Sequence, residues 1–185
     1  AQTLSEEVPE GTVRMVDTLS ASLGQGLLVY LCAQEKRRGA SLEALTAYAE
    51  ATRGKVCHWF TVDDLNHLKR GGRISATAAL FGTMLSIKPV LHVDDAGRLI
   101  PMSKTRGRKA SLLALVDHMA QTAVDPAQQT VFISHGGCLA DAEFVADAIR
   151  TRLGVTDIRI NYAGPVIGNH SGPGTVALFF LGSGR

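Results

Sequence analysis

Residues 55–75 read KVCHWFTVDDLNHLKRGGRIS, and this stretch is the best guide to the fold because strand, helix and glycine signals follow one another in it. Residues 55–62 are rich in β-branched and aromatic side chains and predict a strand. Asp63 then caps a short predicted helix over residues 64–70, which ends at Gly71 and Gly72. The stretch therefore predicts a strand that leads directly into a helix.

The same alternation continues on both sides of this stretch. The turn at residues 94–97, DDAG, separates two apolar runs and predicts a hairpin, and Ser41 is a good N-cap. The other predicted helices are residues 27–38, 41–53, 108–123 and 139–153, and the other predicted strands are 12–17, 87–93, 98–102, 129–134, 157–161 and 175–181. Alternating strands and helices predict an α/β fold with a mixed sheet rather than a helical bundle.

The composition describes a folded and nearly neutral chain. Its 185 residues are 45% hydrophobic and 19% charged, which is enough apolar material for a core and too little charge for a disordered chain. A net charge of +2 is too small to draw the chain onto nucleic acid by its field alone. The longest apolar runs, residues 27–33 and 176–181, fall far short of the ~20 residues of a membrane span. We expect neither a nucleic-acid partner nor a membrane span.

The cysteines and the first residues indicate the compartment. Cys32, Cys57 and Cys138 lie far apart and form no C-x-x-C pair, so neither a disulfide framework nor a zinc ribbon is indicated. Residues 1–7, AQTLSEE, lack the basic and then apolar regions of a signal peptide. We therefore expect a cytoplasmic protein without a metal site.

Two glycine-rich segments, residues 68–75 and 164–174, are the strongest candidates for a functional site. Glycine lets the main chain approach a ligand closely. Arg73 offers five fixed donors to a carboxylate or phosphate, and His170 can give or accept a proton. The alternative interpretation is structural, with Gly71 ending a helix, Arg73 exposed to solvent and the second segment forming a tight turn.

Two further segments suggest an anion site or a partner. Gly24-Gln25-Gly26 lies between a predicted strand and a predicted helix, where phosphates bind. The signal is weak because Val29 stands where a dinucleotide-binding motif has its third glycine. Four cations fall within residues 104–109, which predicts a solvated hairpin end or a contact with a partner or an acidic group.

Two adjacent pairs suggest catalysis or metal binding. Ser134-His135 places a nucleophile next to a base, as in a Ser/His hydrolase-type enzyme, and Cys57-His58 offers two metal-binding side chains. Neighbouring residues on an extended chain point to opposite faces, so neither pair is expected to act together. The enzyme interpretation is therefore an alternative only.

These segments together resemble the DegV family of bacterial fatty-acid-binding proteins over nearly all 185 residues. The matching segments are VDT at 16–18, the S-x-G-x-G pattern at 22–26, FTVDDL at 60–65, LK at 68–69, GGRIS at 71–75, IKP at 87–89, KTRG at 104–107 and HSGPG at 170–174. In the last segment, Ser171 stands where the family usually has threonine.

The resemblance implies a two-lobed α/β protein, with the remainder of a Rossmann-like N-terminal lobe at residues 1–62 and a C-terminal DegV-like α/β lobe with a mixed sheet at 63–185. It implies that one long-chain fatty acid binds between the lobes without any further cofactor. A separate kinase subunit, resembling dihydroxyacetone kinase, would then phosphorylate the carboxylate for phospholipid metabolism, so this chain is not expected to be an enzyme. By motif, the fatty-acid-binding residues are His170, Arg73, Ser171 and Gly172.

Family members are longer, and their T-S-Q-P and L-S-G-T segments, whose hydroxyls bind the carboxylate, would precede Ala1. We therefore expect a trimmed member of the family, and a structural or partner-binding remnant without lipid is the alternative. Small residues within 76–82, beside Phe81, Met84 and Leu85, predict room for an acyl tunnel, although a plain packed helix explains them equally well. The small residues are Ala76, Ala78, Ala79 and Gly82.

Overall fold

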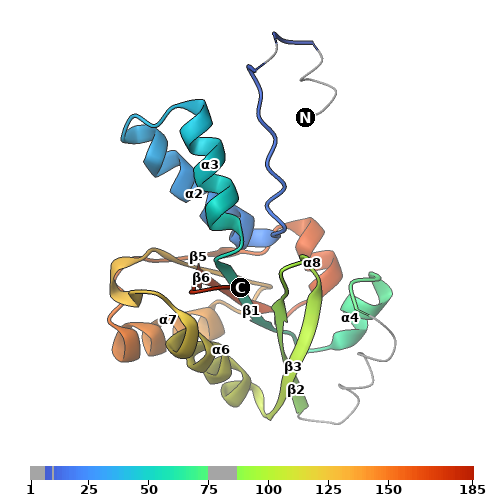
Figure 1. Ribbon diagram of the computed structural model, residues 1–185. Coiled ribbons are helices and arrows are strands. Elements are labelled where there is room, and N and C mark those ends of the chain that lie inside the picture. The colour runs from blue at the N-terminus through green and yellow to red at the C-terminus, as the bar shows by residue number, and fades with distance from the viewer. Residues whose placement is uncertain (1–6, 10, 75–86) are drawn as a thin grey trace.

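The computed structural model describes residues 7–9, 11–74 and 87–185, and a six-stranded mixed sheet forms its centre (Figure 1). The strands are β1 (Val56–Thr61), β2 (Ile87–Val93), β3 (Leu99–Arg106), β4 (Val131–His135), β5 (Ile158–Tyr162) and β6 (Val176–Leu181). Their order across the sheet is β3-β2-β1-β6-β4-β5. β4 and β5 run parallel, and the other neighbouring strands pair antiparallel. The predicted α/β fold with a mixed sheet is confirmed.

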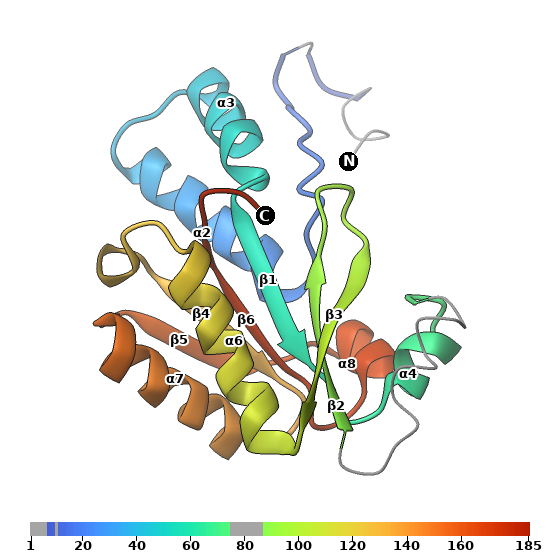
Figure 2. The same cartoon turned by 60° about the horizontal axis from the view of Figure 1, so that its bottom comes forward.

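Helices cover both faces of the sheet. They are α2 (Ser22–Arg37), α3 (Leu42–Arg53), α4 (Leu65–Arg70), α6 (Arg108–Thr122), α7 (Leu139–Leu153) and α8 (Pro165–Ser171), with a short 3-10 turn, η2 (Pro126–Gln128). α6 and α7 pack side by side on one face, and α2 contacts β1, β4 and β6 from the other face (Figure 2). The short helices α4 and α8 contact each other. Among the described helices, none is long and apolar enough to cross a membrane.

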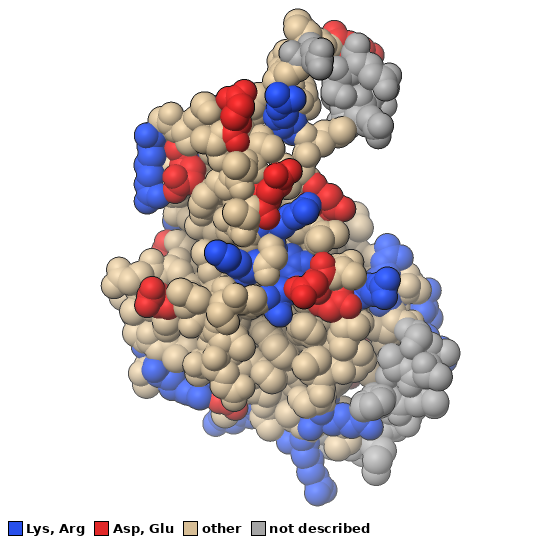
Figure 3. Space-filling model, viewed as in Figure 1, with Lys and Arg blue, Asp and Glu red and all other residues tan. Residues whose placement is uncertain are grey.

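The two-residue period of the strands divides the core into two clusters. On β1, Cys57 and Trp59 join the cluster beneath α6 and α7, whereas Val56 and Phe60 join the cluster beneath α2. All six residues of β1 are buried, as expected for a central strand covered on both faces. Charged side chains of both signs lie interspersed on the upper part of the surface, and Lys and Arg predominate along its lower edge (Figure 3).

Several boundaries agree with the sequence analysis and others do not. The Ser41 side chain caps α3 by accepting a hydrogen bond of 3.2 Å from the Ala44 amide, as predicted. The cap of α4 is Asp64 rather than Asp63, because Asp64 accepts the amide of Asn66 at 2.8 Å. Asp63 instead accepts a hydrogen bond from Lys88 Nζ at 2.8 Å.

Three larger predictions of secondary structure were wrong. Residues 12–17 form no strand, because within the described ranges no neighbouring strand pairs with them. The first long helix begins at Ser22 rather than at residue 27, so Gly24 and Gly26 belong to its first turns. The second glycine-rich segment contains α8, which Pro165 starts and Gly172 ends.

The predicted boundary between residues 62 and 63 falls at the end of β1. Both partners of β1, which are β2 and β6, come from the C-terminal part of the chain. The division into two lobes stays a prediction.

Candidate functional site

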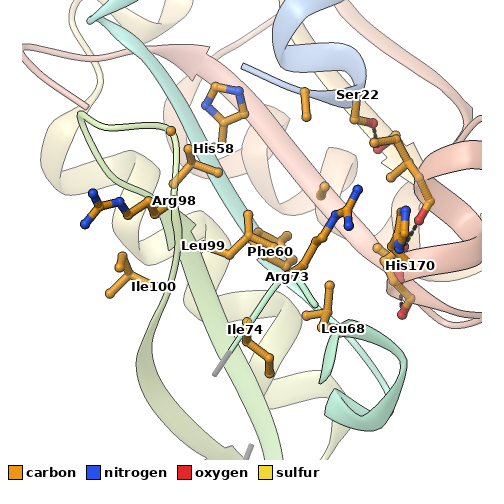
Figure 4. Close-up of a pocket in the computed structure, with 18 of the residues that line it drawn as sticks. Ser22, His58, Phe60, Leu68, Arg73, Ile74, Arg98, Leu99, Ile100 and His170 are labelled. Carbon is orange, nitrogen blue, oxygen red and sulfur yellow. Dashed lines mark hydrogen bonds between the residues drawn. The ribbon is translucent and has the colours of Figure 1, made fainter. Parts of the chain in front are cut away.

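A cavity of about 790 Å³ lies on the face of the sheet that α2 covers (Figure 4). This volume falls within the range of roughly 300–1,000 Å³ that small-molecule sites occupy. The lining residues are Ala21, Ser22, His58, Phe60, Leu68, Gly72, Arg73, Ile74, Val93, Gly97, Arg98, Leu99, Ile100, Pro101, Ser134, Val166, Ile167, His170, Ser171, Thr175, Ala177 and Phe179. Most of them are apolar, and a few polar groups face the same space.

The alternation of side chains along the strands explains this lining. Phe60 on β1, Ser134 on β4 and Phe179 on β6 all lie on the α2 side of the sheet. The hairpin of β2 and β3 contributes Leu99 and other apolar residues, and α8 closes another side. The cavity is therefore assembled from segments that are far apart in the sequence.

Arg73 and His170, the two main candidates from the sequence, both line the cavity, where Arg73 is exposed and His170 is half-buried (Figure 4). Gly71 joins them, because Arg73 Nη1 donates a hydrogen bond of 2.6 Å to the Gly71 carbonyl and the His170 ring packs against the Gly71 Cα. The His170 Nδ1 atom is buried and has no hydrogen-bond partner among the described residues. Because Nδ1 is buried against Gly71, Nε2 is the ring nitrogen left to meet a ligand, and it and the Arg73 guanidinium can both donate hydrogen bonds to an anionic group.

Ser171 and Gly172 play different parts. Ser171 lines the cavity, but its hydroxyl donates to the Ile167 carbonyl at 3.0 Å, which ties it to the preceding turn of α8. Gly172 is absent from the described lining and has a positive φ of 81°, so it ends α8 in a conformation that favours glycine. Gly172 thus shapes the site through the backbone.

The structure separates Ser134 from His135. Ser134 faces the cavity, where its hydroxyl lies 3.2 Å from that of Ser22. The His135 ring packs against Tyr162 on the other side, and its Nδ1 accepts the Cys138 amide at 3.2 Å. These contacts do not form the nucleophile and base pair of a hydrolase, as the alternation of a strand predicts.

His58 also lines the cavity, which the sequence analysis did not predict. Its ring is only 3% exposed, and its Nδ1 lies 2.9 Å from the Val56 carbonyl, so Nδ1 carries the hydrogen. Burial, helped by the nearby charge of Arg185, lowers the pKa of His58 from 6.5 to about 4. The ring is therefore neutral near pH 7. The period of two along β1, which places His58 on the same face as Phe60, was the available signal.

The remaining candidate residues that the structure describes make contacts that stabilise the fold. Gly24 lies inside α2 against the His58 ring, which leaves no room for a side chain at this position. Arg108, one of the four clustered cations, forms an ion pair with Asp141 at 2.8 Å and donates to the Gly174 carbonyl at 2.5 Å. In the described part of the chain, no group of three or more metal-binding side chains occurs. The predicted acyl tunnel at residues 76–85 lies outside the described residues.

Comparison with known proteins decides the family. The family model described as an uncharacterised protein of the DegV family matches residues 1–183. The chain belongs to the DegV family. A DegV domain-containing protein of Clostridium perfringens is 51% identical over 179 residues, which are 97% of this chain and 62% of that relative. The chain thus spans about three fifths of the length of such relatives.

Solved structures of DegV proteins share the fold. The first comparison is a Thermus thermophilus DegV family protein, described for its fatty acid binding. It is 31% identical, with a TM-score of 0.83 over 98% of this chain and 64% of that chain. The second is the fatty acid kinase B3 protein of Streptococcus pneumoniae, loaded with linoleic acid. It is 21% identical, with a TM-score of 0.88 over 97% of this chain and 63% of that chain. At that identity, the second comparison establishes the fold alone.

Proposed function

We propose that this DegV protein binds one long-chain fatty acid in the 790 Å³ cavity and holds its carboxylate at Arg73 and His170. In this proposal a separate kinase subunit, resembling dihydroxyacetone kinase, phosphorylates the presented carboxylate in the cytoplasm, and the DegV chain performs no chemistry itself. The observation that carries the proposal is a largely apolar cavity in which an arginine and a histidine converge.

The apolar lining accounts for affinity. Burying about fifteen methylene groups at ~0.8 kcal/mol each provides on the order of 12 kcal/mol of transfer free energy, before the entropy of association is subtracted. Phe60, Leu99 and Phe179 supply apolar surface from three strands. His58, which is neutral near pH 7, adds no charge to the wall of the cavity.

The converging nitrogens account for the choice of a carboxylate. A buried carboxylate is costly unless donors meet it, and hydrogen bonds to charged groups are the strong ones. Arg73 can present its planar fork, and Nε2 of His170 can add a second donor, because Nδ1 of the same ring is buried against Gly71. Ser171 would support this end of the cavity by fixing the last turn of α8, and Gly172 by fixing the turn after it.

Relatives support both parts of the proposal. The Thermus thermophilus protein is named for fatty acid binding, and the Streptococcus pneumoniae protein is named as part of a fatty acid kinase. This chain spans only about three fifths of the length of such proteins. The ligand and the kinase partner are therefore proposed by comparison with these longer proteins.

Native mass spectrometry of the protein as purified tests the proposal, followed by the same measurement after denaturation. We expect an adduct of fatty-acid mass that is lost on denaturation. His170→Ala should weaken binding of added palmitate, whereas Asn169→Ala, an exposed neighbour on α8 that does not line the cavity, should leave it unchanged. A folded chain that neither carries nor binds a fatty acid would favour the remnant without lipid.

A further inference from the structure

The ends of α4 and α8 hold each other through two glycine–histidine contacts. His170, in the last turn of α8, packs against Gly71, the residue that ends α4. In return, His67 in α4 packs against Gly172, the residue that ends α8. A Cβ on Gly172 would lie 2.5 Å from Cδ2 of His67 and 2.7 Å from its Cγ. Neither glycine could carry a side chain without moving the facing ring.

The two helices differ in how firmly the core holds them. α4 buries Leu65 and Leu68, which are 3% and 2% exposed, so hydrophobic contacts anchor it. α8 buries only Ser171, and its Val166 is 71% exposed. Little apolar burial fixes the position of α8, so its contacts with α4 must contribute much of its placement.

The His67 ring itself is oriented by its own helix. Arg70 Nη2 lies 3.3 Å from His67 Nδ1, at a spacing of three residues on α4. The ring therefore reaches Gly172 from a helix that is anchored independently of it. His67 is not among the described residues that line the cavity.

We propose that His67 is a positioning residue for His170: by packing on Gly172 it sets α8 so that His170 stands beside Arg73. Gly71 completes the arrangement, because it touches His170 and accepts the hydrogen bond from Arg73. This inference rests on the proposed function, since it assigns His67 an effect on the carboxylate end of the ligand. Phe60, Leu99 and Phe179, on other walls, would hold most of the acyl chain, although Val166 and Ile167 of α8 also line the cavity.

The test compares palmitate with hexadecanol, which has the same chain length and no carboxylate, on the full chain. For His67→Ala we expect palmitate affinity to fall roughly 3- to 30-fold while hexadecanol affinity stays unchanged. His67→Phe keeps a ring on Gly172 and should restore most of the affinity for palmitate. Asn66→Ala, an exposed change on the same helix, is the matched control and should bind both ligands as the parent does.

Each outcome bears on a different statement. If the parent protein binds palmitate no better than hexadecanol, the proposed function fails and this inference fails with it. If the parent prefers palmitate and His67→Ala keeps the same preference, only the positioning role of His67 is overturned. An equal loss for both ligands would also overturn it, because that pattern reports a general defect in packing. Failure of His67→Phe to restore the affinity would contradict ring packing as the cause.

Discussion

Protonation of His58 should destabilise the fold between pH 7 and pH 5. The folded protein lowers the pKa of this ring from 6.5 to about 4, first through burial and then through the charge of Arg185. Between these two values the unfolded chain binds a proton that the folded chain does not. The contribution of His58 to the free energy of unfolding is therefore fully present above pH 6.5 and is lost as the pH falls toward 4.

The size of the effect follows from the same shift. Each unit of pKa corresponds to about 1.4 kcal/mol, so the loss between pH 7 and pH 5 is about 2 kcal/mol. The ring is 3% exposed, so solvent screens this effect little. Burial also lowers the pKa values of His92 and His118, and these half-exposed rings contribute with the same sign. The loss of stability due to His58 is therefore isolated by comparing the parent protein with a variant that lacks this histidine.

Urea unfolding at both pH values provides the assay, applied to the parent and to His58→Asn. Asparagine can still donate to the Val56 carbonyl but does not titrate. The variant will be less stable at every pH because it leaves a gap, so the decisive quantity is the change in unfolding free energy between pH 7 and pH 5. We expect that change to be about 2 kcal/mol smaller in the variant. An equal change in both proteins would refute the reasoning.

Two further predictions concern glycine and cysteine positions. Gly71→Ala should weaken palmitate binding about tenfold, because the φ of −74° at this position accepts alanine but the new Cβ would displace His170. Gly168→Ala, whose Cβ would meet nothing within 4 Å, is the control. Equal palmitate titration curves for the two variants would contradict the contact between Gly71 and His170. Cys57 is buried and its pKa is raised to about 11, chiefly by burial, so iodoacetamide at pH 8 should label it far more slowly than half-buried Cys32. Peptide mapping measures both, and equal labelling would contradict the burial.

Local signals predicted most of the fold. β2 and α7 occupy the residues that periodicity assigned to them, and the Asp94–Gly97 turn joins β2 to β3 as a hairpin. Ser41 caps α3 because its side chain satisfies a free amide of the first turn. Such features depend on neighbours within a few positions, so the sequence reveals them directly.

The wrong predictions concern segments whose conformation depends on contacts with distant parts of the chain. Residues 12–17 have the composition of a strand, but a strand also needs a partner along its edge. The two glycines near the start of α2 indicated a loop, although one of them, Gly24, is required because the His58 ring lies against it. α8 also escaped prediction, since seven residues with two glycines nearby give a weak helical signal.

The sequence by itself determined the α/β class and the positions of most elements, and it indicated Arg73 and His170 as residues with the chemistry to hold an anion. Only the tertiary structure decided which of these residues meet. Gly71 brings the arginine and the histidine together, and the faces of the strands decide that Ser134 enters the cavity while His135 does not. The reason is that local hydrogen bonds and side-chain periodicity act over a few residues, whereas a binding cavity forms only when segments far apart in the chain pack against one another.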